Sequence, residues 1–229
     1  GSTVWTLNNG VKVVYLPTTH KNDEVRINLS MKGGTTLIET AELPSFDDNI
    51  WALYQNNRGL SKFSGVQLKK MLTGKNARCS LYIGGTRHGL NVTSTPKDLE
   101  TAMQLLYLNI VDPRFDNEEY LVGINQLKAL LPNLETQPMF KFQQYAEQTL
   151  YGNHERRQTI STELVEKANI SDFEKASRRL FGNATVGLCL FGQTTHLALQ
   201  ADLILLGGGQ LAAGTGNLCL HRSGILLQS

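Results

Sequence analysis

Three carboxylates lie close together in the chain, at Glu42, Asp47 and Asp48. Grouped carboxylates can ligate a divalent metal ion or take a proton from a metal-bound water, which is hydrolase chemistry. These three also stand at the start of a predicted helix, where acidic side chains commonly interact with the helix dipole or with solvent. We favour the dipole interpretation and keep a hydrolase with unconventional ligands at Asp47 and Asp48 as an alternative.

The histidines and cysteines show no metal-ligand spacing. The histidines are His20, His88, His154, His196 and His221. They are interpreted as ordinary surface or core residues. The cysteines at 79, 189 and 219 form no C-x-x-C pair, which argues against a zinc knuckle and against a disulfide framework. No metal site is predicted in this chain.

The composition is that of a folded protein. Hydrophobic residues make up 41% and charged residues 18% of the 229 positions. The net charge of +2 and the scattered basic residues argue against nucleic-acid binding. No run of about 20 apolar residues is present, so no transmembrane segment is predicted. Gly1-Ser2 is interpreted as a tag remnant.

Turn residues and apolar periodicity divide the chain into elements. The predicted strands cover residues 4–7, 11–15, 25–31, 78–83, 88–93 and 186–191. The predicted helices cover about residues 44–55, 64–74, 95–112, 116–131, 141–150, 163–168 and 171–182. Asn8-Asn9-Gly10 supplies a tight turn for an N-terminal hairpin. Gly33-Gly34 ends the strand over 25–31, and Pro132 and Pro138 bracket a connection.

Three helix starts carry capping signals. Thr95 precedes a proline, and Asp116 with Glu119 and Ser171 with Glu174 have the spacing of capping boxes. The order of strands and helices predicts an α+β domain over residues 3–192. Its sheet is expected to be mostly antiparallel, with helices packed on one face.

The segment 193–229 differs from the rest of the chain. From Leu180 to the end, only Asp202 and Arg222 are charged, and glycines interrupt the sequence repeatedly. A surface helix needs a polar face, which this segment barely supplies. It is interpreted as an atypical, low-charge, Gly-rich tail that carries no functional residue.

Several short motifs occur in the order in which one protein family carries them. They are residues 7–13 (LNNGVKV), Gly33-Gly34-Thr35, the helix pair around Pro113-Arg114-Phe115-Asp116, residues 150–152 (LYG), and Phe181, Val186 and Gly192. In this combination, residues 3–192 resemble the pitrilysin/insulinase family of zinc metallopeptidases, the inverted zincins that include the mitochondrial processing peptidases.

The resemblance implies an architecture in which only one half binds zinc. Family members pair homologous α+β domains. One domain carries an H-x-x-E-H motif and a downstream Glu, and the other has usually lost them. Residues 59–75 look more like the non-catalytic domain. Zinc is therefore expected in a homologous catalytic partner domain, in the same chain or in a separate subunit.

The family's motif falls on residues 45–49 (SFDDN) of this chain. Ser45 and Asn49 stand at the two histidine positions, and Asp48 stands at the position of the general base. The downstream Glu falls near Gln126. Hydroxyl and amide groups are poor zinc ligands, so these residues are interpreted as degenerate motif positions with no catalytic role.

The resemblance also implies residues that hold substrate. In the family, a non-catalytic domain can reach across the cleft with Arg and Tyr side chains, and Tyr151, Arg156 and Arg157 match that segment. An edge strand near residues 24–32 is a second candidate, because a peptide can add to a free sheet edge.

The predicted function is a non-catalytic, substrate-chamber domain of a zinc-dependent peptidase that hydrolyses peptides or small unfolded proteins. An inactive scaffold or binding subunit of a larger assembly is an alternative. The resemblance favours the periplasm or cell envelope of a bacterium. The domain by itself is predicted to be inactive.

Overall fold

The computed structural model describes residues 1–6, 12–18, 21, 23–182 and 186–191. The Asn8–Gly10 turn and the segment 193–229 lie outside these residues. The described strands are β1 (Thr3–Thr6), β2 (Lys12–Leu16), β3 (Val25–Lys32), β4 (Ala77–Ile83), β5 (Arg87–Ser94) and β6 (Val186–Phe191). The helices are η1 (Gly34–Leu37), η2 (Thr40–Phe46), α1 (Asp48–Asn57), α2 (Gly65–Met71), η3 (Pro96–Asp98), α3 (Leu99–Val111), α4 (Asn117–Leu134), α5 (Pro138–Tyr151), α6 (Thr162–Lys167) and α7 (Ile170–Gly182).

The chain divides into two compact units, which are described separately. The sheet unit contains the described residues of 1–35, 68–113 and 180–191, and the helical unit contains 36–67 and 114–179. Neither unit is a continuous stretch of chain. No helix among the described residues has both the length and the apolar composition that a membrane crossing requires.

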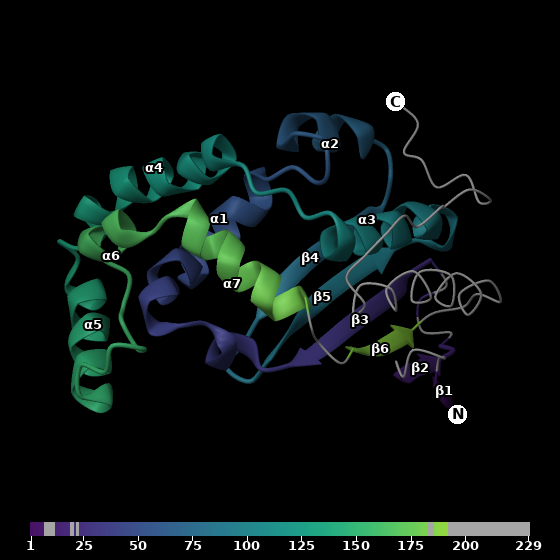
Figure 1. The fold of residues 1–229 in the computed structure, drawn as a ribbon, viewed down its shortest axis with the longest axis horizontal. Coiled ribbons are helices and arrows are strands. Elements are labelled where there is room, and N and C mark those ends of the chain that lie inside the picture. Colours follow the sequence, from purple (N-terminus) through teal and green to yellow (C-terminus); the bar gives the residue numbers. More distant parts are fainter. Residues whose placement is uncertain (7–11, 19–20, 22, 183–185, 192–229) are drawn as a thin grey trace. The chain divides into compact units, whose positions relative to one another are not determined.

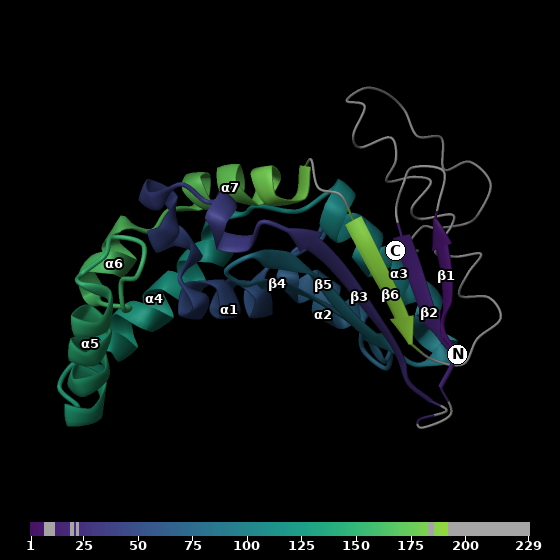
Figure 2. The same ribbon diagram turned by 90° about the horizontal axis from the view of Figure 1, so that it is seen from below.

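The sheet unit holds six strands in the order β1-β2-β6-β3-β5-β4 (Figure 1). All pairings are antiparallel except the parallel pairing of β2 with β6. Helix α3 packs along β4 and β5 on one face (Figure 2). In β3, Val25, Ile27, Leu29 and Met31 are buried while the alternate residues are polar, as the period of two predicts. The predicted α+β class is confirmed.

One expectation about this sheet is wrong. Strand β3 does not form an edge, because it pairs with β5 on one side and with β6 on the other. The backbone groups of residues 25–32 are therefore used within the sheet and cannot receive a peptide strand. The strand over 186–191, which comes last in the sequence, is the one that fills the space beside β3.

His88 on β5 fixes the turn that ends β3. The imidazole is fully buried, its Nδ1 accepts a hydrogen bond from the Gly34 N–H (3.1 Å), and its Nε2–H donates to the Leu180 carbonyl (2.7 Å). Gly34 has a φ of +57°, and a Cβ there would lie 2.0 Å from the Gly84 oxygen, so only glycine fits. Of the two environments that the sequence left open for this histidine, surface or core, the structure shows the core.

The helical unit is centred on Phe173 of α7. Its ring stacks on Phe46 at a centroid distance of 4.5 Å and contacts Trp51, Tyr54 and Tyr120 at 5.0 to 5.7 Å. The two buried phenols find partners, since the Tyr54 hydroxyl donates to the Arg114 carbonyl (3.1 Å) and the Tyr120 hydroxyl to the Ser45 carbonyl. Burial raises the pKa of Tyr54 to about 12.

Several predicted helix boundaries are wrong for local reasons. The predicted helix over 44–55 is interrupted at Asp47, whose backbone is extended. Helix α4 continues through Pro132 to Leu134, and α5 begins at Pro138, where the missing N–H of proline is tolerated. Helix α7 begins at Ile170, and the side chain of Asn169, not Ser171, accepts from the N–H of Asp172.

Glu119 does not complete the capping box predicted with Asp116. The Asp116 carboxylate caps α4 as expected, accepting from the N–H groups of Glu118 and Glu119. The Glu119 carboxylate instead accepts hydrogen bonds from the backbone N–H groups of Gly59 (2.6 Å) and Gly65 (2.8 Å). It therefore anchors both ends of the loop 59–65 to α4.

Candidate functional site

Ser45 lies in the interior of the helical unit. It belongs to η2 and is 1% exposed. Its hydroxyl oxygen accepts a hydrogen bond from the Asn169 N–H (3.0 Å), and its carbonyl accepts from the Tyr120 hydroxyl (3.3 Å). Both polar groups of this residue therefore join η2 to other elements of the unit.

Asp47 separates Ser45 from Asp48 and Asn49, the next two positions of the predicted degenerate motif. It is the N-cap of α1, and its Oδ1 accepts from the backbone N–H (2.9 Å) and the side-chain amide (3.0 Å) of Asn49. Burial raises the pKa of Asp47, and its hydrogen bonds to Asn49 oppose that effect. Asp48 and Asn49 are exposed in the first turn of α1, so Ser45 and Asn49 do not share one continuous helix.

Gln126 is on the exposed face of α4, whose buried face carries Tyr120, Ile124, Leu127 and Leu131. The four positions predicted to be degenerate thus lie on η2, α1 and α4, one buried and three exposed. Their hydroxyl, amide and single carboxylate groups do not fit a zinc ion, which takes thiolate, imidazole and carboxylate ligands. Among the described residues, no group of three or more His, Cys, Asp or Glu side chains is arranged to hold a metal ion.

The structure brings Tyr151 and Arg157 together and gives Arg156 a different environment. The Arg157 guanidinium lies over the Tyr151 ring, 4.5 Å from its centroid, and both residues are exposed. The Arg156 guanidinium is half-buried and donates to the Ile38 carbonyl (3.1 Å) and to the Thr40 hydroxyl (3.0 Å). Arg156 therefore links the turn after α5 to the start of η2 and the residues just before it.

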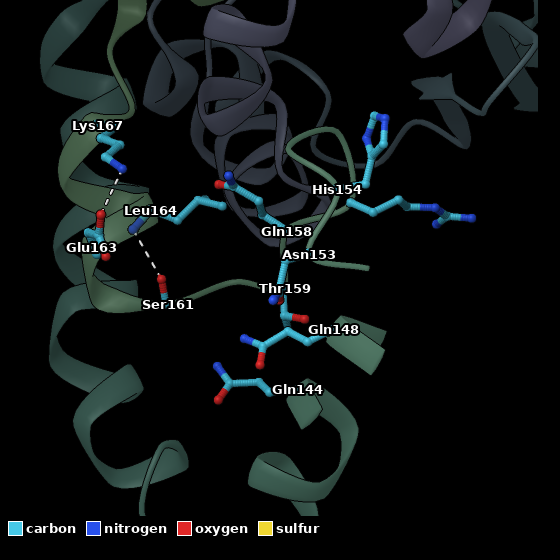
Figure 3. Close-up of a pocket in the computed structure, with 11 residues that line it drawn as sticks. Gln144, Gln148, Asn153, His154, Gln158, Thr159, Ser161, Glu163, Leu164 and Lys167 are labelled. Atoms are coloured by element: carbon cyan, nitrogen blue, oxygen red, sulfur yellow. Dashed lines mark hydrogen bonds and ion pairs between the residues drawn. The ribbon is translucent and has the colours of Figure 1, made fainter. Parts of the chain in front are cut away.

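A pocket of about 260 Å³ lies between α5, the turn after it and α6 (Figure 3), and Arg157 is one of its lining residues. We name it the α5–α6 pocket. Its lining residues are Gln144, Gln148, Asn153, His154, Arg157, Gln158, Thr159, Ser161, Glu163, Leu164 and Lys167. Of these, the sequence had singled out only Arg157 for substrate contact. Scattered Gln, Asn and Thr residues carry no motif, so no sequence signal marked the others.

No protein-family model matches the sequence, and no curated protein matches it significantly. Solved structures match its fold. The periplasmic protease PqqL from Escherichia coli superposes with a TM-score of 0.72 and 19% identity, over 89% of this chain and 22% of that one. A peptidase M16 inactive domain from Pseudomonas fluorescens gives a TM-score of 0.66 and 15% identity, over 93% and 50%. The chain has the fold of a pitrilysin-type (M16) peptidase domain.

This chain corresponds to only part of each of the longer proteins that it matches. The ferredoxin protease FusC, solved in complex with Arabidopsis ferredoxin, matches with a TM-score of 0.65 and 18% identity, over 88% of this chain and 22% of that one. The chain thus spans between about a fifth and a half of the length of these structures. The M16 likeness covers both catalytic proteases and an inactive domain.

Proposed function

We propose that this chain is a non-catalytic, substrate-holding domain of a zinc-dependent peptidase that acts on peptides or small unfolded proteins. The observation that carries the proposal is the local structure of residues 45–49. In place of one helix presenting two ligands at positions i and i+4, the chain has a buried serine, an extended aspartate and a new helix start. Such a segment does not present the two ligands that would hold zinc and its bound water.

A catalytic partner is part of the proposal. The fold is that of domains found in chains about two to four times as long, since 93% of this chain matches 50% of one and 89% matches 22% of the other. A homologous domain that carries the zinc ligands would supply the metal and the general base, whether in the same chain or in a separate subunit. We extend the proposal to a bacterial periplasm or envelope, the setting named for PqqL.

The residues that would contact substrate are Tyr151 and Arg157. Both are exposed, and the stacked ring holds the guanidinium in a defined orientation. A guanidinium presented in this way can hold a peptide carbonyl or carboxylate through charge-assisted hydrogen bonds. Arg156 already bonds to Ile38 and Thr40, so we propose that it maintains the turn and contacts no substrate.

Two alternatives make different predictions. A scaffold subunit would have no H-x-x-E-H domain upstream in its chain or in an associated one, whereas a substrate-holding domain requires one. A hydrolase built on Asp47 and Asp48 would bind metal in this chain. The use of Asp47 Oδ1 as a helix cap argues against that hydrolase.

The first experiment is elemental analysis of the purified chain after dialysis against trace zinc. We expect a zinc content near zero and no hydrolysis of an unfolded peptide substrate. Zinc at about one ion per chain that is lost in an Asp47→Asn/Asp48→Asn variant would overturn the proposal in favour of the hydrolase.

A further inference from the structure

The α5–α6 pocket is lined by groups that can both donate and accept hydrogen bonds. The side chains of Gln144, Gln148, Gln158 and Ser161 line it together with Thr159. In Figure 3 the amide ends of Gln144, Gln148 and Gln158 point toward the side on which Ser161 and α6 lie. Primary amides match the paired N–H and C=O of a peptide group.

Only part of this hydrogen-bonding capacity is used within the described residues. Ser161 caps α6 by accepting from the Leu164 N–H (3.2 Å), and the Gln144 amide donates to the Ile160 carbonyl (3.3 Å). The amides of Gln148 and Gln158 have no such bond among the described residues. In the same part of the chain, Thr159 Oγ1 is buried and has no hydrogen-bond partner within the described structure, which marks a place where polar groups remain to be satisfied.

The charged residues of the pocket give it an excess of positive charge. Lys167 pairs with Glu163, the Nζ lying 2.8 Å from Oε1, so these two charges largely compensate each other. Arg157 faces no carboxylate within ion-pair distance in the described structure, and its guanidinium is held by the Tyr151 ring. A ligand with one negative charge would therefore find in the lining one cation, Arg157, that no carboxylate of the described structure compensates.

We propose that the α5–α6 pocket binds an acidic residue of an extended peptide. The carboxylate would meet Arg157, and the amides of Gln148 and Gln158 would hold the neighbouring peptide groups. The volume of about 260 Å³ suits this ligand, because sites for drug-sized molecules are larger, at roughly 300–1,000 Å³. The inference rests on the proposed function, since it names the kind of peptide that the substrate-holding domain prefers.

Nuclear magnetic resonance titration of the 229-residue chain tests the inference. The probes are three capped tripeptides, acetyl-Gly-X-Gly-amide, in which X is Glu, Gln or Lys. We expect the Glu peptide to bind most tightly and to shift the side-chain amide signals of Gln148 and Gln158. The Lys peptide should bind about fivefold more weakly, as expected for the loss of a partly screened charge interaction.

A matched pair of variants locates the binding. Gln148→Glu adds a carboxylate to the pocket, whereas Gln143→Glu adds the same charge to an exposed position of α5 outside it. Gln148→Glu should weaken binding of the Glu peptide about fivefold, and Gln143→Glu should leave it nearly unchanged. Circular dichroism verifies that both variants are folded.

The outcomes separate this inference from the proposed function. Equal binding of the Glu peptide by the two variants, or equal binding of the three peptides, overturns the pocket assignment and leaves a substrate-holding domain in place. Binding of no peptide overturns the pocket assignment and the holding role together. The zinc measurement tests the non-catalytic character independently of all three results.

Discussion

The hydroxyl oxygen of Ser45 accepts a hydrogen bond from the backbone N–H of Asn169, 124 positions further along the chain. This contact ties η2 to the start of α7 and satisfies an N–H at that helix start. Ser45, which the resemblance assigns to a metal-ligand position of the family, thus has a structural role in this chain. The position is also closed to larger side chains, because Ser45 is 1% exposed.

Introducing histidines at the two positions that the resemblance assigns to zinc ligands should not create metal binding. In Ser45→His/Asn49→His, the first imidazole must enter a packed site, and overpacking costs typically 1–3 kcal/mol. The second lies after the break at Asp47, so the two rings do not share a helix face. We expect a destabilised protein with no stoichiometric zinc, measured by urea unfolding and elemental analysis. Tight zinc binding by this variant would refute our account of residues 45–49.

Removing the Glu119 carboxylate should loosen the loop 59–65. In Glu119→Ala, the N–H groups of Gly59 and Gly65 lose their acceptor, and a hydrogen bond to a charged group contributes about 1.5–3 kcal/mol. We expect a loss of about 2–4 kcal/mol in the free energy of unfolding and faster hydrogen exchange at both glycines. Glu118→Ala, at the exposed neighbouring position, is the control and should change stability by less than about 0.5 kcal/mol. Similar losses in both variants would contradict the anchoring role.

Protonation of His88 should destabilise the sheet unit. Burial lowers the pKa of His88 below its ordinary 6.5, and the imidazolium could no longer accept the Gly34 N–H. As the pH falls, the unfolded chain binds this proton first. The stabilising contribution is therefore complete above pH 6.5 and is lost as the pH falls through the folded-state pKa.

Urea unfolding between pH 7.5 and 5 measures this effect. One such group contributes a slope of at most about 1.4 kcal/mol per pH unit. We expect His88→Gln to be less stable at neutral pH and to lose this slope. The exposed His154→Gln should keep it. An unchanged slope in His88→Gln would show that other groups cause the pH dependence.

The ion pair of Arg179 with Glu42 should be sensitive to a conservative change. The guanidinium contacts both carboxylate oxygens (2.9 and 3.0 Å), and hydrogen bonding to Glu42 raises the pKa of Arg179. Lysine cannot reproduce the two parallel bonds. We expect Arg179→Lys to lose roughly 1 kcal/mol, a modest figure because the arginine side chain is 37% exposed and screened by solvent.

A double-mutant cycle with Arg179→Met and Glu42→Gln isolates this pair. Removing the arginine alone leaves Glu42, which is buried, with only the Glu39 N–H as a donor in the described structure. The double variant should therefore lose less than the sum of the two single variants. Strict additivity would mean that the pair contributes no coupling energy.

Local signals in the sequence were sufficient where neighbouring residues decide the structure. The alternation in residues 25–31 predicts β3, and Thr95 accepts from the Asp98 N–H as its position before Pro96 indicates. The α+β class follows from the order of these elements. The sequence also contains a local signal for the break at Asp47, because Asp is a favoured N-cap. The apolar residues on both sides nevertheless suggested one continuous helix.

Contacts between distant residues decided the rest. The Glu119 carboxylate does not complete the capping box at the start of its own helix. It accepts instead from two glycine N–H groups that are near in space but distant in sequence. Arg156 bonds to residues more than a hundred positions away, which no pattern around it reveals. The α5–α6 pocket is lined by mostly uncharged side chains from three short segments, so neither periodicity nor a motif marked it.

The position of β6 has a consequence for how the protein is made. This strand is the last described segment of the chain, yet it lies between β2 and β3, near the middle of the sheet. During synthesis, β2 can pair with β1 and β3 with β5, but the strand that lies between β2 and β3 is missing until residues 186–191 leave the ribosome. Pairings between such distant segments form slowly, and open strands invite association with other chains. Nascent chains that stop short of residue 186 should therefore bind chaperones and aggregate more than chains that extend beyond residue 191.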